Sequence, residues 1–525
     1  MGGKKLKKKI YIISFIVMFF LILGFQYKVD YDIRTQTPSD KWSKEVAISK
    51  GNVNTFPKIL KSDKNNIVAF NNGDKLQLVV TDGLGKKIKE KTFETKDTLV
   101  KEVNLLEGQG VFYLSWNSYD NGANCLKTIK LDKELNELEH TKIENITETY
   151  QIGKEILIVG YKDKIQVLNM AKNSKLNLSI KGATLFSGVE TEKGFMFTYC
   201  DGEEGFSYIT VENGVAAMPK LAGVLGKSAS MTFLRSATSS DSKDGYLLIE
   251  YSIKGDFAGT RILRFALEGN SKNSSELYIN NNSKLVYNVV GANSKEGARF
   301  FATTNRIFGV KDWQQSIVDF ILKDNKVANY NYVSRLSGLT TYPAISGDTI
   351  AYCSYNKPGE YGVYLASQND QFKKVNNIHL PIEKKQATLN TLQGFMYSLV
   401  YIIYPIKWII PAALLISIMT FFSYNFSDKK KKLYFLLISF ISFVLKMSVI
   451  LSNSYGDNLY LLPQILSHKW VAILTSVVIS TICYSFGYNL YKEDLEGMAI
   501  SKFGIALALD TMLTMMIFVP FFITL

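Results

Sequence analysis

The chain has 525 residues, a formal net charge of +14 and only three histidines. This length exceeds what one hydrophobic core usually organises, so we expect two or more structural units. The charge excess is diluted, because residues 27–391 hold 47 basic and 41 acidic side chains. A nucleic-acid-binding protein concentrates positive charge on one face, so we predict no nucleic-acid partner.

The N-terminus, MGGKKLKKKIYIISFIVMFFLILGF, joins a basic segment to an apolar one. Five Lys lie within residues 1–9, and residues 10–26 carry no charge. A secretory signal peptide would continue into small residues of A-x-A type, whereas this chain continues GFQYKVDYD. We therefore favour an uncleaved transmembrane anchor at 10–26 over a cleaved signal peptide. The basic segment places residues 1–9 in the cytoplasm.

Residues 27–391 show the pattern of an all-β domain. Short β-branched or alternating runs are separated by polar turns, as in NIVAFNNGDKLQLVV and GFMFTYCDGEEGFSYITV. Comparable runs start near residues 66, 110, 155, 194, 245, 299 and 348. A spacing of about 40–50 residues, each unit a small antiparallel sheet, is typical of a β-propeller. We predict about seven blades, closed between the first and last repeats.

The last repeat, YPAISGDTIAYCSYNKPGEYGVYLAS at 342–367, resembles a blade of the TolB-type, WD40-like β-propellers. It has a Pro before a first strand, a Gly/Asp turn, a second strand, a polar loop and a third strand. The segment 56–70, FPKILKSDKNNIVAF, parallels its start. The resemblance implies a fold and no particular function. A pair of β-sandwiches or an irregular all-β domain is the alternative.

An aromatic stripe leads into the C-terminal membrane domain, residues 392–525. It consists of Tyr397, Tyr401, Tyr404 and Trp408, which recur at helical spacing. Tyr and Trp favour the membrane interface, so these residues are predicted interface anchors. Residues 393–405 are either an interfacial or kinked lead-in that breaks at Pro405, or part of one tilted helix with aromatic packing.

Four apolar runs follow, at about 406–426, 434–452, 471–490 and 504–525, and each is a candidate crossing. With the N-terminal anchor they give five crossings. The run KKKK at 429–432 then lies in the cytoplasm, as does the basic N-terminus, in agreement with the positive-inside rule. This topology puts residues 27–391 outside the cytoplasm. Few Arg and abundant Asn and Ile indicate an AT-rich bacterial genome, so we predict a bacterial cell (plasma) membrane.

The sequence contains no pattern that identifies catalytic, cofactor-binding or metal-binding residues. The histidines are scattered, and Cys125, Cys200, Cys353 and Cys483 are widely spaced without a CxxC motif. No nucleophile or phosphate-loop motif stands in the required context. We therefore expect no metal, no cofactor and no structural disulfide.

Two ionisable residues fall inside apolar runs, Lys446 and Asp510, and such residues are often functional. Counted from the cytoplasmic ends of their runs, they lie roughly 20 Å and 9 Å deep at 1.5 Å per residue. This offset predicts that the Lys446 side chain extends to the interface. A direct pair would need tilted or offset helices.

These observations favour a non-enzymatic, membrane-anchored β-propeller that binds or scaffolds an envelope protein or polymer. A subunit of a transport or export system is the alternative, in which the four C-terminal helices conduct or gate. A propeller hydrolase is a third possibility. Polar residues that face one another within the helix bundle would favour the transport reading.

Overall fold

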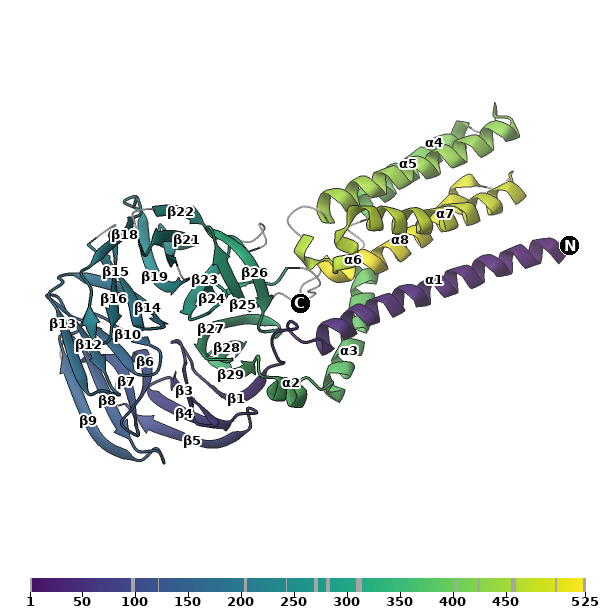
Figure 1. Ribbon diagram of the computed structural model, residues 1–525. Coiled ribbons are helices and arrows are strands. Elements are labelled where there is room, and N and C mark those ends of the chain that lie inside the picture. The colour runs from purple at the N-terminus through teal and green to yellow at the C-terminus, as the bar shows by residue number, and fades with distance from the viewer. Residues whose placement is uncertain are drawn as a thin grey trace. The chain divides into compact units, whose positions relative to one another are not determined.

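The computed structural model describes residues 2–522 apart from 96–99, 121, 203–204, 242, 269–271, 280–283, 308–313, 402–404, 423–424, 455–458 and 496–497. The chain forms two compact units. The β unit is built from residues within 37–305 and 314–378, and the helical unit from residues within 1–36, 306–313 and 379–525. Figure 1 shows small sheets in the first unit and bundled helices in the second.

Consecutive strands of the β unit form small antiparallel sheets. The first two sheets contain β2 (Lys58–Ser62), β3 (Asn65–Asn72), β4 (Lys75–Asp82) and β5 (Lys87–Glu94), then β6 (Val100–Gly108), β7 (Val111–Asp120), β8 (Ala123–Leu131) and β9 (Glu137–Glu144). The next two contain β10 (Thr149–Ile152), β11 (Ile156–Gly160), β12 (Ile165–Asn169) and β13 (Ser174–Leu178), then β14 (Ala183–Thr191), β15 (Gly194–Asp201), β16 (Gly205–Glu212), β17 (Val215–Ala216) and β18 (Lys220–Val224).

The remaining strands continue the pattern. One sheet contains β19 (Met231–Ser240), β20 (Asp244–Ile253), β21 (Asp256–Ala266) and β22 (Lys272–Glu276). An eight-stranded sheet contains β23 (Val286–Ala292), β24 (Ala298–Asn305), β25 (Gln314–Lys323), β26 (Lys326–Tyr332), β27 (Gly338–Ser346), β28 (Thr349–Lys357), β29 (Glu360–Ser367) and β1 (Val46–Gly51). A short helix, α2 (Asp370–Asn376), follows β29.

The first strand of each group is an inner strand, and the inner strands form a closed ring. In chain order β2, β6, β10, β14, β19, β23 and β27 each contact the next, and β27 contacts β2. The second strands are buried on both faces, as in β3 and β15, which explains their continuous apolar sequences. Outer strands such as β5 and β9 are largely exposed. This ring of radial antiparallel sheets is a β-propeller.

The predicted repeat starts agree with the second strands to within one residue. The predicted starts at 66, 194 and 348, for example, correspond to Asn65, Gly194 and Thr349. The predicted closure between the two ends of the domain is also present, because β1 pairs antiparallel with β29. All four cysteines are buried and free.

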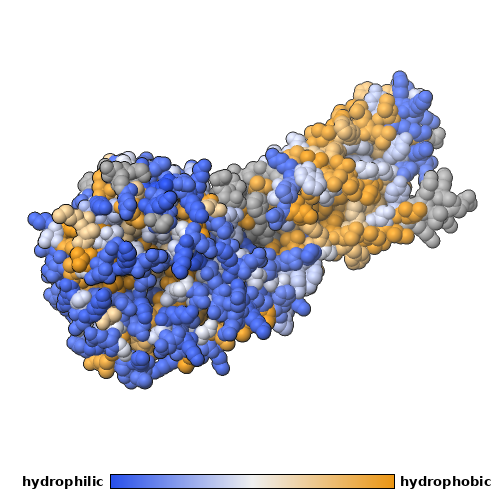
Figure 2. Space-filling view, in the orientation of Figure 1, coloured by the Kyte–Doolittle hydropathy of each residue, from blue (hydrophilic) through white to orange (hydrophobic). Residues whose placement is uncertain are grey.

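The helical unit contains α1 (Gly2–Thr35), α3 (Pro381–Val400), α4 (Ile406–Phe422), α5 (Asp428–Ser454), α6 (Gln464–Ser467), α7 (Lys469–Glu493) and α8 (Ala499–Phe522). Among the described residues, α1, α5, α7 and α8 are long and apolar enough to cross a membrane, and α4 is a shorter apolar helix of 17 residues. Hydrophobic residues dominate the visible surface of these helices, whereas the β unit is mainly hydrophilic (Figure 2).

Two features of the helices refine the sequence analysis. The helix α1 continues beyond residue 26, because its polar residues find partners within the unit: Gln26 donates to the Met516 and Ile517 carbonyls at 3.2 and 3.1 Å. The lead-in is broken rather than one tilted helix, since α3 ends at Val400 and α4 starts at Ile406.

Candidate functional site

The inner strands of the propeller surround a cavity of about 870 Å³. Its walls come from every inner strand and from the segments that precede β2 and follow β23. A cavity of this size lies within the range of ligand-binding sites in proteins. Residues from all parts of the β unit therefore meet at one site that no short sequence motif encodes.

Bulges in the inner strands shape this cavity. A register shift interrupts the pairing between five of the inner strands and the second strand beside each. The inner strands concerned are β6, β14, β19, β23 and β27. Three bulge residues, Leu185, Asn288 and Tyr342, have positive φ angles of 54°, 54° and 56°. A bulge bends its strand and redirects side chains, and bulges are common next to functional sites. Asn288 and Tyr342 consequently line the cavity.

Two cations lie in the cavity without salt bridges. The guanidinium of Arg235 lies 3.9 Å from the ring centroid of Phe56, and the Lys58 Nζ lies 5.9 Å from that of Tyr150. Neither cation forms a hydrogen bond or an ion pair with any of the described residues. Burial lowers the pKa of Lys58, the nearby Glu102 opposes this, and the charge of Arg235 adds to it. Neither group is therefore neutralised by direct contact with a described residue.

The neighbouring carboxyl groups accept hydrogen bonds from other residues of the β unit. Glu148 accepts a hydrogen bond of 2.8 Å from the Leu185 amide, and Glu250 accepts one of 2.8 Å from the Val289 amide. Each bond joins one sheet to the inner strand of the next. Glu102 accepts from Thr149 Oγ1 at 3.3 Å. Burial raises the pKa of all three carboxyls, and that of Glu148 reaches about 7, with repulsion from Glu102 contributing.

The charged residues that line the cavity are mostly basic. They are Lys58, Lys101, Lys154, Arg235 and Lys295 against Glu102 and Glu190. Because walls of low dielectric constant concentrate an electric field, this lining favours a negatively charged ligand. Aromatic side chains, including Tyr150 and Tyr342, supply flat surfaces beside the cations.

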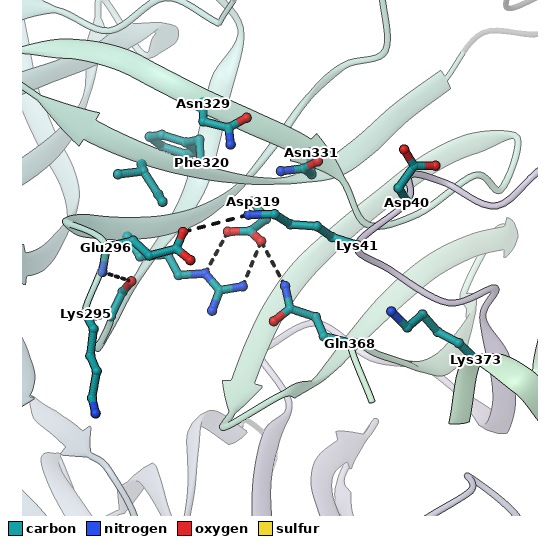
Figure 3. Close-up of a pocket in the computed structure, with 13 residues that line it drawn as sticks. Asp40, Lys41, Lys295, Glu296, Asp319, Phe320, Asn329, Asn331, Gln368 and Lys373 are labelled. Atoms are coloured by element: carbon teal, nitrogen blue, oxygen red, sulfur yellow. Dashed lines mark hydrogen bonds and ion pairs between the residues drawn. The ribbon is translucent and has the colours of Figure 1, made fainter. Parts of the chain in front are cut away.

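A second cavity, of about 510 Å³, contrasts with the first (Figure 3). Its central carboxylate, Asp319, accepts hydrogen bonds from Arg299 at 2.8 and 2.7 Å and from Trp42 Nε1 at 3.0 Å. Gln368 adds a bond of 3.4 Å. These groups attach the segment before β1 to β24 and β25. The buried charge is matched within the protein, so we assign this cluster a structural role.

Lys446 and Asp510 form a direct pair, so the Lys446 side chain does not extend to the interface as its depth suggested. The Lys446 Nζ lies 2.8 and 3.0 Å from the two carboxylate oxygens and also contacts Ser480 Oγ at 2.5 Å and Thr514 Oγ1 at 3.3 Å. The side chains of the pair are 0% and 1% exposed. Depth was counted along each apolar run separately. The packing of α5 and α8 offsets the two helices, and this brings the two side chains into contact.

The predicted interface anchors do not form one helical stripe. Trp408 is completely buried in the helical unit, whereas Tyr401 is 51% exposed and lies in the break between α3 and α4. Tyr397 is partly exposed on α3, and Tyr404 lies outside the described residues. The burial of Trp408 contradicts an anchoring role at the lipid surface. Anchoring by Tyr397 and Tyr401 stays a prediction.

Sequence reasoning missed Arg235 and Lys58. Each is one basic residue within a strand, in a chain with 61 basic residues, and no spacing distinguishes it. Among the described residues, no three His, Cys, Asp or Glu side chains gather as a metal site would require. The expectation of no metal and no cofactor stays a prediction.

No protein-family model matches the sequence, and no curated protein matches it. Among solved structures, it is similar to the β-propeller domain of the Trilobed protease from Pyrococcus furiosus, with 9% identity, a TM-score of 0.36 and coverage of 61% of this chain and 97% of that one. It is also similar to a luciferin-regenerating enzyme (10% identity, TM-score 0.34, 62% and 94% covered). A prolyl endopeptidase matches with 12% identity and a TM-score of 0.36, over 64% of this chain and 48% of that chain. The fold assignment rests on the strand contacts above, and the TolB-type resemblance stays a prediction.

Glu148 provides a test of the buried carboxylates around the cavity. Its pKa rises from 4.5 to about 7 on folding, so the folded chain retains a proton that the unfolded chain releases between these values. The resulting stabilisation is complete below about pH 4.5 and is lost as the pH rises to about 7. Glu148→Gln keeps an acceptor for the Leu185 amide but does not titrate. Its melting temperature relative to the native chain should therefore rise between about pH 5 and pH 8. A difference that is constant over this range would contradict the burial of this carboxyl.

Proposed function

We propose that this protein is a membrane-anchored binding module whose propeller takes an envelope protein or polymer into its central cavity. On this proposal the propeller lies outside the cytoplasm of a bacterial cell, and the helical unit holds it at the plasma membrane. The single observation that carries the proposal is the cavity with two unpaired cations, Arg235 and Lys58, among aromatic side chains.

The strand pattern supports seven blades. The eight-stranded sheet divides naturally into two blades, because β25 and β27 are joined only by the parallel pairs Gln314–Gly338 and Gln315–Leu339. One blade then contains β23 to β26, and the other contains β27 to β29 with β1 as its outer strand. Closure of the last blade by a strand from the start of the domain fixes the ring.

The lysine distribution supports the topology. Lysines occupy the start of α1 and the start of α5. An even number of crossings, by α1 and α4, between the two basic segments returns the chain to the cytoplasm. The propeller sequence lies between these two helices and is therefore outside in this proposal.

One experiment on intact cells tests both parts of the proposal. Cysteine replaces Lys101, which lines the cavity, or Lys175, which is exposed on the outer strand β13. Cysteine at Lys430, at the start of α5, is the cytoplasmic control. An impermeant maleimide that carries a photoreactive group should label the first two variants and not the third. The native cysteines are buried and should give little background.

After illumination, the label at position 101 should cross-link to a partner protein or polymer, and the label at 175 should not. Equal cross-linking from both positions would contradict binding in the cavity. Labelling at position 430 without labelling at 175 on intact cells would overturn the topology.

A role in transport is the second candidate, and the Lys446–Asp510 pair is the observation that favours it. Polar side chains from α5, α7 and α8 face one another there, including Ser480, which donates to Asp510 at 2.7 Å. Ionisable groups within membrane helices often line ion or proton pathways. No observation favours the hydrolase alternative.

Paired substitutions separate a structural pair from a transport site. Lys446→Met or Asp510→Asn alone leaves a buried group without its partner, which costs about 3–5 kcal/mol. We expect lower abundance of each single variant in the membrane. The double variant, Lys446→Met with Asp510→Leu, should recover abundance and keep cross-linking from position 101. A double variant that is abundant and still binds, yet abolishes a cellular phenotype of the native gene, would support transport instead.

A further inference from the structure

The two cations of the central cavity, Arg235 and Lys58, are half-buried, so each loses part of its hydration. A buried charge is destabilising unless a counter-charge or hydrogen-bond acceptors compensate it. Elsewhere in the β unit this rule is met: Arg299 pairs with Asp319 at 2.7 Å, and Arg264 pairs with Asp244 at 2.7 Å. Arg235 and Lys58 differ, because neither forms an ion pair with a described residue.

The nearby carboxylates do not neutralise this pair by direct contact. Glu148 and Glu250 accept backbone hydrogen bonds from adjacent inner strands, and Glu102 accepts from Thr149. Arg235 and Lys58 therefore keep their N–H donors for a group that enters the cavity.

The position of Arg235 suits a planar oxyanion. Its guanidinium stacks on Phe56, at 3.9 Å from the ring centroid, which holds the side chain. Its N–H groups form no hydrogen bond with any residue that the structure describes. An Arg held in this way can donate two parallel hydrogen bonds to a carboxylate or a phosphate. Lys58 adds a second positive charge that contributes no fixed geometry.

Three further lysines make the rest of the cavity lining favourable for a negatively charged ligand. Lys101, Lys154 and Lys295 also line the cavity, and all three are exposed. Such an arrangement draws an anion inward and lets further negative groups contact the rim.

We infer that the central cavity recognises an oxyanion, a carboxylate or a phosphate, that Arg235 and Lys58 bind together beside Phe56 and Tyr150. This inference rests on the proposed binding function and specifies its ligand as an acidic protein segment or an acidic polymer. The two unpaired cations supply the charge, and the aromatic rings supply the surface on which the group that carries the anion packs.

Binding of two labelled probes to the purified full chain in detergent tests this inference. The probes are tripolyphosphate and a hexaglutamate peptide, with hexaglutamine as the uncharged control, all at one ionic strength. The variants are Arg235→Met, Arg235→Lys and Lys58→Gln. Lys175→Met removes the same unit of charge from an outer strand and is the matched control.

The native chain should bind at least one anionic probe and not hexaglutamine. Preference for tripolyphosphate identifies a phosphate ligand, and preference for hexaglutamate identifies a carboxylate ligand. Arg235→Met and Lys58→Gln should weaken binding about tenfold or more, the scale of a lost charged hydrogen bond. Arg235→Lys should lie between them and the native chain, and Lys175→Met should leave binding unchanged.

Equal weakening by Lys175→Met and Arg235→Lys would overturn the inference, because binding would then reflect overall charge. Failure of both anionic probes, while position 101 still cross-links in cells, would show that the cavity binds a ligand of another class. Loss of both probe binding and cross-linking would overturn the proposed function itself. Melting temperatures of all variants establish that each is folded, and Arg235→Lys keeps the positive charge at this position if Arg235→Met is unstable.

Discussion

The ring of inner strands depends on one pairing between strands from opposite ends of the β unit. The strand β1 pairs with β29, and its Ile48 packs with Val53 against Val363 and Leu365. Each sheet of a propeller buries its faces against its two neighbours, so an open ring would leave the first and last sheets half covered. The same closure brings β27 beside β2. The pairing of β1 with β29 therefore joins the two ends of the β unit and supports the closed ring around the central cavity.

The two cavities of the β unit show how structural and functional charges can be distinguished. Asp319 is buried and accepts hydrogen bonds from three side chains, so its charge is compensated within the protein and needs no ligand. Arg235 also lines a cavity but is half-buried; its guanidinium stacks on the Phe56 ring and pairs with no described residue. Buried polar groups are nearly always satisfied within a folded protein, as Asp319 is. The half-buried Arg235 has no ion-pair partner among the described residues and is available to a ligand.

The sequence predicted the architecture well because propeller strands have local signals. The second strands are buried on both faces, and their apolar runs end at glycine turns such as Gly73, with φ of 66°. The starts of these strands were therefore predictable to within one residue. The break between α3 and α4 was one of two alternatives that the sequence left open, indicated by Pro405.

The site could not be predicted in the same way. Arg235 reaches the cavity through a bulge in β19, and Phe56 meets it from the other end of the domain. Bulge positions depend on pairing with the neighbouring strand, which no local pattern in this sequence reports. The Lys446–Asp510 pair could not be predicted for a related reason. The offset between α5 and α8 that allows it is a property of helix packing. Trp408 is buried by that same packing, although its residue type favours the membrane interface.

The central claim is that an anionic ligand binds to Arg235 and Lys58 in the cavity. Modification of arginine by phenylglyoxal, measured by mass spectrometry, tests it at Arg235 with Arg264 as an internal reference, since Asp244 pairs with that residue in the folded chain. Our account predicts that Arg235 reacts more slowly relative to Arg264 in native membranes than in the purified, washed protein. An identical ratio of the two rates in both preparations would contradict it.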